Sequence, residues 1–150
     1  MSLQNLLAIQ RLQTFEATPG GVERMLASAV RNLADARLTG LSADNRFDAA
    51  YKTIMQCAMI GLWANGYRTV TSQPGHHQTA LQALPKTMGL AQDRVIVLDA
   101  LRKQRNLNDY EGNPVEPASV RECIAQAKSL LDATRQWLKH NRPDLIDGTT

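Results

Sequence analysis

Apolar residues recur at helical spacing along almost the whole chain. The segment from 22 to 36 illustrates this, with apolar residues at alternating spacings of four and three: Val22, Leu26, Ala29, Leu33 and Ala36. No stretch longer than a few residues alternates between apolar and polar with a period of two, which is the pattern of a half-buried strand. The pattern therefore predicts an all-α fold without strands.

Glycine, proline and asparagine divide this pattern into separate helices. The predicted helices cover residues 3–15, 22–37, 43–65, 76–85, 91–110 and 117–140. Residues 67–74 are predicted to form a loop, Pro85 kinks or cuts the fourth helix before Met88-Gly89, and residues 111–114 form a turn. Residues 144–150 are predicted to be a tail.

Short connections between these helices predict an up-and-down helical bundle of about five to six helices. The chain of 150 residues fits a single domain, with an N-terminal helix and turn at 1–19. Long amphipathic helices leave room for a helix-mediated homodimer.

Composition excludes several classes of protein. The longest apolar run, residues 58–64, is too short to span a bilayer, so no membrane contact is expected. Cys57 and Cys123 have no second Cys or His at ligand spacing. We expect two buried free thiols, no metal site, no cofactor and a cytoplasmic location. The net charge of +3 permits association with nucleic acid without demonstrating it.

Motifs of conventional enzymes are sparse. No Ser or Cys triad is indicated, and Gly20-Gly21 lacks the residues of a phosphate loop. His76 and His77 follow Gly75, and adjacent helical residues point about 100° apart, which disfavours chelation of one metal by both. A polar helix start is the favoured interpretation, and one His reaching a cleft as a base or phosphate donor is the alternative.

Arg46 is the other isolated candidate. A cation near a helix N-terminus works against the helix dipole, so Arg46 is expected to have a partner elsewhere. It is either an ordinary surface residue or a member of a binding site.

The helix predicted at 91–110 changes character at Arg102. Its apolar side runs through Leu98. At about 100° per residue, three polar side chains fall within roughly 40° of the direction of Leu98, namely Arg102, Arg105 and Asp109. Desolvating an unpaired charge costs several kcal/mol, so these groups should pair with each other or line a cleft.

Two interpretations of this stripe are compatible. In one, Arg102 or Arg105 pairs with Asp109 in an internal network that locks the end of the helix. In the other, the stripe is an anion site, because an arginine binds phosphate through two parallel hydrogen bonds. Asn106 would then bind a base or ribose, and Tyr110 would donate to an oxyanion.

The sequence Arg105-Asn106-Leu107-Asn108-Asp109-Tyr110, followed by one final long helix, resembles the signature region of the HEPN (higher eukaryotes and prokaryotes nucleotide-binding) superfamily. Residues 46–51 resemble the second long helix of that family, and the similarity covers about residues 20–140. The resemblance implies a small helical bundle, often dimeric. Many members are encoded beside minimal nucleotidyltransferases in toxin–antitoxin pairs, and several are metal-independent ribonucleases.

The chain departs from the nuclease signature, in which a His follows the Arg after four to six residues. The residues at those positions after Arg105 are Asp109, Tyr110 and Glu111. Metal-free RNA cleavage needs a base and an acid. Asp109 is a candidate base, although an adjacent arginine weakens a carboxylate in that role. A His from a neighbouring helix is the other candidate.

Three functions therefore remain. The leading expectation is nucleotide or RNA binding by a possible toxin–antitoxin component, through Arg46, Arg102, Arg105, Asn106, Asp109 and Tyr110. The first alternative is a protein-interaction module that docks a nucleotidyltransferase-type partner and has no ligand of its own. The second is a weak metal-independent ribonuclease with the catalytic residues His76, His77, Arg105 and Asp109.

Overall fold

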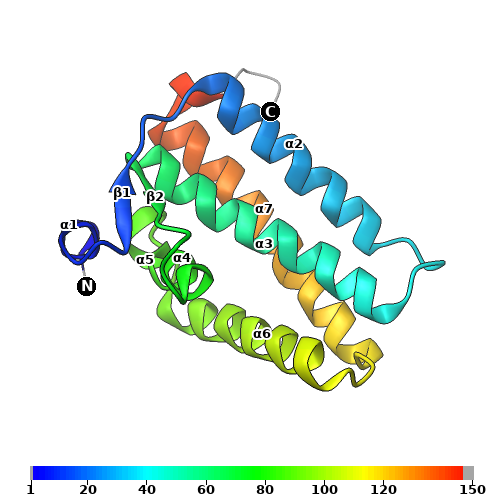
Figure 1. Cartoon of the computed structure of the whole chain (residues 1–150). Helices are drawn as coiled ribbons and strands as arrows, with labels where there is room; N and C mark the ends of the chain where they lie inside the picture. Colours follow the sequence, from blue (N-terminus) through cyan, green and yellow to red (C-terminus); the bar gives the residue numbers. More distant parts are fainter. Residues whose placement is uncertain (1, 147–150) are drawn as a thin grey trace.

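The computed structural model describes residues 2–146 and shows a helical bundle with one small two-stranded sheet (Figure 1). In chain order its elements are α1 (Leu3–Ala8), β1 (Leu12–Thr14), α2 (Pro19–Ala36), α3 (Ala43–Ala64), β2 (Tyr67–Thr69), α4 (His76–Gln82), α5 (Leu84–Thr87), α6 (Gln92–Glu111), α7 (Pro117–Asn141) and the 3-10 turn η1 (Pro143–Leu145). The predicted all-α fold class is confirmed.

Local capping signals explain why the long helices begin and end close to the predicted boundaries. The Thr18 hydroxyl accepts a hydrogen bond from the Gly21 amide at the start of α2 (3.1 Å). The Ser42 hydroxyl accepts one from the Asn45 amide at the start of α3 (3.1 Å). At the end of α6, Gly112 adopts a left-handed φ of 70°, which glycine tolerates without a steric penalty.

Helix α3 is the centre of the bundle, with α2 packed on one side and α7 on the other (Figure 1). All five apolar residues of the predicted α2 stripe are buried, with exposed fractions of 4% or less. Side chains from several sides of α3 are buried as well, because neighbours surround it. Burial of these faces supplies the main favourable free energy of folding.

Helix α6 lies along the lower edge of the molecule in Figure 1, where it packs against α4, α5 and α3. Its buried residues are Val95, Leu98 and Leu101. No α6 residue after Leu101 is buried. The charges of Arg102 and Arg105 in the polar half of α6 act on His77 in the first turn of α4, and this arrangement positions the candidate site.

The N-terminal segment and the strand that pairs with it correct three predictions. The predicted helix 3–15 ends at Ala8, because Gln10 takes a left-handed φ of 63° and the chain turns. Residues 12–14 form β1, which pairs antiparallel with β2 in the register Leu12↔Thr69. The prediction of no strands is wrong here, and so is the predicted loop at 67–74 over its first three residues.

Two further boundaries were expected from proline. The fourth helix is cut as predicted, with α5 beginning at Leu84 and Pro85 in its first turn. The predicted tail at 144–150 is wrong in its first part, because Leu145 in η1 is only 1% exposed. The prediction for residues 147–150 lies outside the described residues.

Both cysteines are free and buried, as predicted. Burial raises the pKa of the Cys57 thiol and that of the Cys123 thiol to about 12 each. Within residues 2–146, no helix combines the length and the apolar character needed to cross a membrane.

Candidate functional site

Arg102 is held within its own helix. Its Nε donates to Asp99 Oδ1 at 2.7 Å, and the two side chains are only 14% and 15% exposed. The Lys103 ammonium lies 3.6 Å from the second oxygen of Asp99. Of the two predicted pairings with Asp109, the one with Arg102 is therefore not formed, because Asp99 takes its place one turn earlier.

Arg105 is held mainly by α3. Its Nε donates to Asp48 Oδ1 at 3.1 Å, and its Cζ lies 5.0 Å from the centroid of the Tyr51 ring. Within its own helix, Arg105 Nη1 lies 4.0 Å from Asp109 Oδ2, which is a loose version of the predicted pair. The Arg105 side chain is 28% exposed. A carboxylate and an aromatic face thus orient the guanidinium, and part of it still reaches the surface.

His77 reaches the same place from the first turn of α4. Its Nδ1 lies 3.2 Å from the Tyr51 hydroxyl, and the two ring centroids are 5.9 Å apart. The ring of His76 stands edge-on to that of His77 at a centroid distance of 4.6 Å. Gly75, with a φ of 77°, is the residue from which α4 starts. The tertiary structure therefore brings one of the two predicted histidines to the polar stripe, through a tyrosine.

We refer to this assembly as the Arg105 cluster, which consists of Asp48, Tyr51, His77, Asp99, Arg102, Arg105 and Asp109. Sequence reasoning missed Asp48, Tyr51 and Asp99 as members. Two of these residues, Asp48 and Tyr51, belong to the N-terminal half of α3. Their spacing of three places both on one side of a helix, which was the available signal.

Burial determines the protonation of two members of the cluster. Burial raises the pKa of Tyr51 to about 12, against the opposing effect of the Arg105 and Arg102 charges. Burial also lowers the pKa of His77, and the charges of His76, Arg105 and Arg102 act in the same direction. Near neutral pH, Tyr51 is therefore a phenol and His77 a neutral imidazole.

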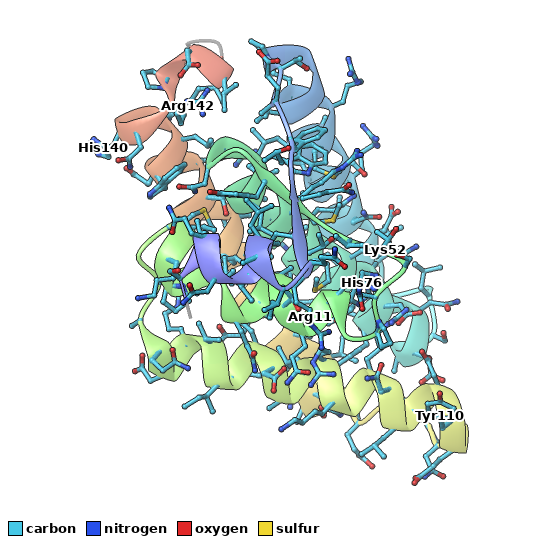
Figure 2. The ribbon with its side chains drawn as sticks, turned by 60° about the vertical axis from the view of Figure 1, so that its left-hand side comes forward. Arg11, Lys52, His76, Tyr110, His140 and Arg142 are labelled. Atoms are coloured by element: carbon cyan, nitrogen blue, oxygen red, sulfur yellow. The ribbon has the colours of Figure 1, made fainter. Side chains whose placement is uncertain are left out.

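The remaining predicted site residues lie apart from these contacts. The Arg46 guanidinium donates through Nε to the carbonyl oxygen of Ala36, the last residue of α2, at 2.8 Å. The Ala36 carbonyl is therefore the partner that was expected for Arg46 near a helix N-terminus. This hydrogen bond gives Arg46 a structural role at the end of α2. Asn106 is exposed. Tyr110 is 92% exposed and lies at the C-terminal end of α6 (Figure 2).

Further cationic side chains lie on the same side of the molecule as α4. In the view of Figure 2, Lys52 of α3 and the side chain of His76 lie near each other, with Arg11 beneath them. Arg11 Nη1 donates to the carbonyl oxygen of Pro74, just before α4, at 2.7 Å. Lys52 and Arg11 therefore add positive charge to the side of the molecule seen in Figure 2.

The Arg105 cluster lies apart from two hollows of the described surface. Two hollows of about 560 and 540 Å³ lie around Phe15 and Trp63, and no member of the Arg105 cluster lines either of them. The Arg105 cluster combines an oriented guanidinium with an imidazole, whereas neither hollow is lined by a histidine.

No group of three or more His, Cys, Asp and Glu side chains in residues 2–146 is arranged to hold a metal ion. Fold and cluster together define an all-α bundle with a mixed-charge surface site at the junction of α3, α4 and α6. Comparison with protein-family models, with curated proteins and with solved structures finds no match.

Proposed function

We propose that the Arg105 cluster binds the phosphate groups of a nucleotide or RNA, as the HEPN resemblance implies. The observation that carries this proposal is the state of Arg105. Asp48 and the Tyr51 ring orient its guanidinium, while Nη2 has no hydrogen-bond partner among residues 2–146. An arginine oriented in this way presents N–H groups that match phosphate oxygens.

Charge balance sets the strength expected of this site. The positive charges of Arg102, Lys103 and Arg105 face three carboxylates, which belong to Asp48, Asp99 and Asp109. A phosphate must therefore compete with a carboxylate for Arg105, and Asp109 is the most exposed of the three at 57%. We expect moderate affinity that falls as the salt concentration rises.

The test compares two arginine variants. Arg105→Gln removes the proposed phosphate clamp, whereas Arg121→Gln removes an exposed charge from α7 and serves as the matched control. Fluorescence anisotropy at low salt measures binding of a labelled single-stranded RNA and of ATP. We expect Arg105→Gln to weaken binding about tenfold or more, because a charge-assisted hydrogen bond contributes about 1.5–3 kcal/mol. Equal affinities of the two variants would exclude the site.

A second candidate function, assembly with another protein chain, is favoured by the outer face of α6. This face consists of Ile96, Ala100, Lys103, Leu107 and Tyr110. Ile96, Leu107 and Tyr110 are 63%, 57% and 92% exposed. Their spacing alternates between four and three, which is the seam pattern of paired helices.

We propose a second copy of the chain as the occupant of this face. The one charge on the face, Lys103, lies 3.6 Å from its own Asp99, so the face is close to neutral and fits an identical neutral face. A homodimer would place two Arg105 clusters in one particle and strengthen binding of a polyanion.

Sedimentation velocity over a range of protein concentrations tests the dimer. We expect Leu107→Glu to shift the protein to monomer, whereas Leu38→Glu, at an exposed loop residue, leaves the dimer intact. A wild-type monomer at all concentrations would contradict the dimer. If that monomer formed a stable complex with a nucleotidyltransferase whose gene lies beside its own, the docking-module function would replace the proposed homodimer.

A further inference from the structure

The Tyr51 hydroxyl is a buried group with one hydrogen-bond partner. Tyr51 is 2% exposed, and His77 Nδ1 at 3.2 Å is the only partner of its hydroxyl within residues 2–146. If Nδ1 carried a proton and donated it, the tyrosine hydrogen would be left without an acceptor. A buried donor without a partner costs about 1–3 kcal/mol. The arrangement in which Tyr51 donates to an unprotonated Nδ1 is therefore favoured.

This hydrogen bond fixes the position of the single proton of a neutral imidazole. When Nδ1 accepts, the proton must be on Nε2. The groups around His77 disfavour a second proton, because Arg102 and Arg105 approach from α6 and His76 is adjacent. The carboxylates of Asp48 and Asp99 are bonded to Arg105 and Arg102, and neither makes a hydrogen bond to His77.

We propose that Tyr51 is a positioning residue that holds His77 as a hydrogen-bond donor, through Nε2–H, to the phosphate that Arg105 binds. This inference rests on the proposed phosphate-binding function. Both groups lie against the same ring, with the His77 centroid 5.9 Å and the Arg105 Cζ 5.0 Å from the Tyr51 centroid. The ring is buried and rigid, so it sets the positions of both donors together.

The same geometry indicates which class of ligand the site binds, and it excludes His77 as a general base. Two donors that offer no acceptor in return select an anionic group with acceptor oxygens only, and an ionised phosphate is such a group. The basic lone pair of His77 is occupied by Tyr51, so His77 cannot take a proton from the 2′-hydroxyl of RNA. The site therefore binds RNA without using His77 as the base of cleavage.

The first test is the tautomer of His77 in the full chain. Long-range ¹H–¹⁵N correlation spectra distinguish protonated from unprotonated ring nitrogens, and the His77 signals are those lost in His77→Gln. We expect an unprotonated Nδ1 and a protonated Nε2. In Tyr51→Phe we expect a mixture of tautomers, while Tyr67→Phe, which alters a tyrosine of β2, leaves the His77 signals unchanged. A protonated Nδ1, or a tautomer unaffected by Tyr51→Phe, would overturn the inference.

The second test measures single-stranded RNA affinity by anisotropy, together with RNA cleavage in a chelator. We expect Tyr51→Phe and His77→Gln each to weaken binding about three- to tenfold, as loss of one hydrogen bond implies. Wild-type cleavage at saturating RNA that disappears in His77→Gln, with a pH profile that requires an unprotonated imidazole, would overturn the inference. If the tautomer is as expected but Arg105→Gln binds RNA normally, the proposed function fails and the Tyr51–His77 arrangement stands. If Arg105→Gln fails to bind and the tautomer is reversed, only this inference fails.

Discussion

Arg105 has two acidic neighbours that act on it in opposite ways. Asp48 accepts a hydrogen bond from Nε at 3.1 Å and thereby orients the guanidinium. Asp109 stands 4.0 Å from Nη1, too far for a strong hydrogen bond, and is 57% exposed. Asp48 therefore positions the proposed phosphate clamp, whereas Asp109 mainly competes with the phosphate.

Removing the competing charge should strengthen the binding of anions. We expect Asp109→Asn to raise RNA affinity about two- to fivefold at low salt, the range of an exposed ion pair. Anisotropy titrations at two salt concentrations check this, and the gain should shrink at high salt. Asp35→Asn, at an exposed residue of α2, makes the same change in net charge away from the cluster. An equal gain in both variants would show that only net charge matters.

His77 should contribute to the pH dependence of stability. Its pKa in the folded chain is lowered from the ordinary value of 6.5, chiefly by burial. As the pH falls below 6.5, the unfolded chain binds a proton at this residue before the folded chain does, so the free energy of unfolding decreases. We expect His77→Gln to flatten this acid-side decrease in urea denaturation between neutral pH and pH values below the lowered pKa. His140→Gln, at an exposed residue, should leave it unchanged.

The polar stripe itself was predictable from α6 alone, because helical periodicity places Arg102, Arg105 and Asp109 near the direction of Leu98. The partners of Arg105 and His77 in other helices were not predictable from the sequence. The bond from Arg105 to Asp48 joins residues 57 positions apart, and the contact from Tyr51 to His77 joins residues 26 apart. Such pairs depend on the offset of one helix along another, and no local sequence signal determines this offset.

Helix ends and strands differed in how well the sequence predicted them. Helix ends follow from side chains within a few residues, as at Thr18 and Ser42. The strands β1 and β2 are only three residues each and gain their hydrogen bonds from each other. Three residues are too few to show a period of two, so the helical pattern of the N-terminal segment was extended too far.

Leu12 tests whether β1 is an integral part of the fold. This side chain is 2% exposed and belongs to the core. We expect Leu12→Ala to lower the free energy of unfolding by about 2–5 kcal/mol, through lost burial and the cavity that remains. Urea denaturation measures the change. Gln13→Ala, in the same strand but exposed, should change stability by less than about 0.5 kcal/mol. A small effect at Leu12 would contradict the observed packing.

At the scale of the whole molecule, residues 142–145 pack against one end of the helical bundle. Arg142, which follows α7, donates to the carbonyl oxygen of Ala64 at the end of α3. The Arg142 guanidinium also forms two hydrogen bonds to Asp144, at 3.1 and 2.9 Å. This turn brings Leu145 into the core next to α2 and α7, where a tail had been predicted.

Leu145→Ala checks this closure. We expect a loss of about 2–5 kcal/mol in the free energy of unfolding, as for other buried leucines, whereas a tail residue would show almost none. Lys139→Ala, at an exposed residue of α7, is the control. Thermal unfolding followed by circular dichroism measures both, and equal melting temperatures would support the original prediction of a tail.

The sequence by itself determined the helical class, the buried stripes, the ends of the long helices and the turn of α6 from apolar to polar. These features depend on periodicity and on capping groups within one or two turns. Only the tertiary structure decided that Arg46 caps α2, and that His77, Tyr51 and Asp48 join Arg105. The physical reason is that close packing fixes the offset and rotation between helices through many small contacts acting together.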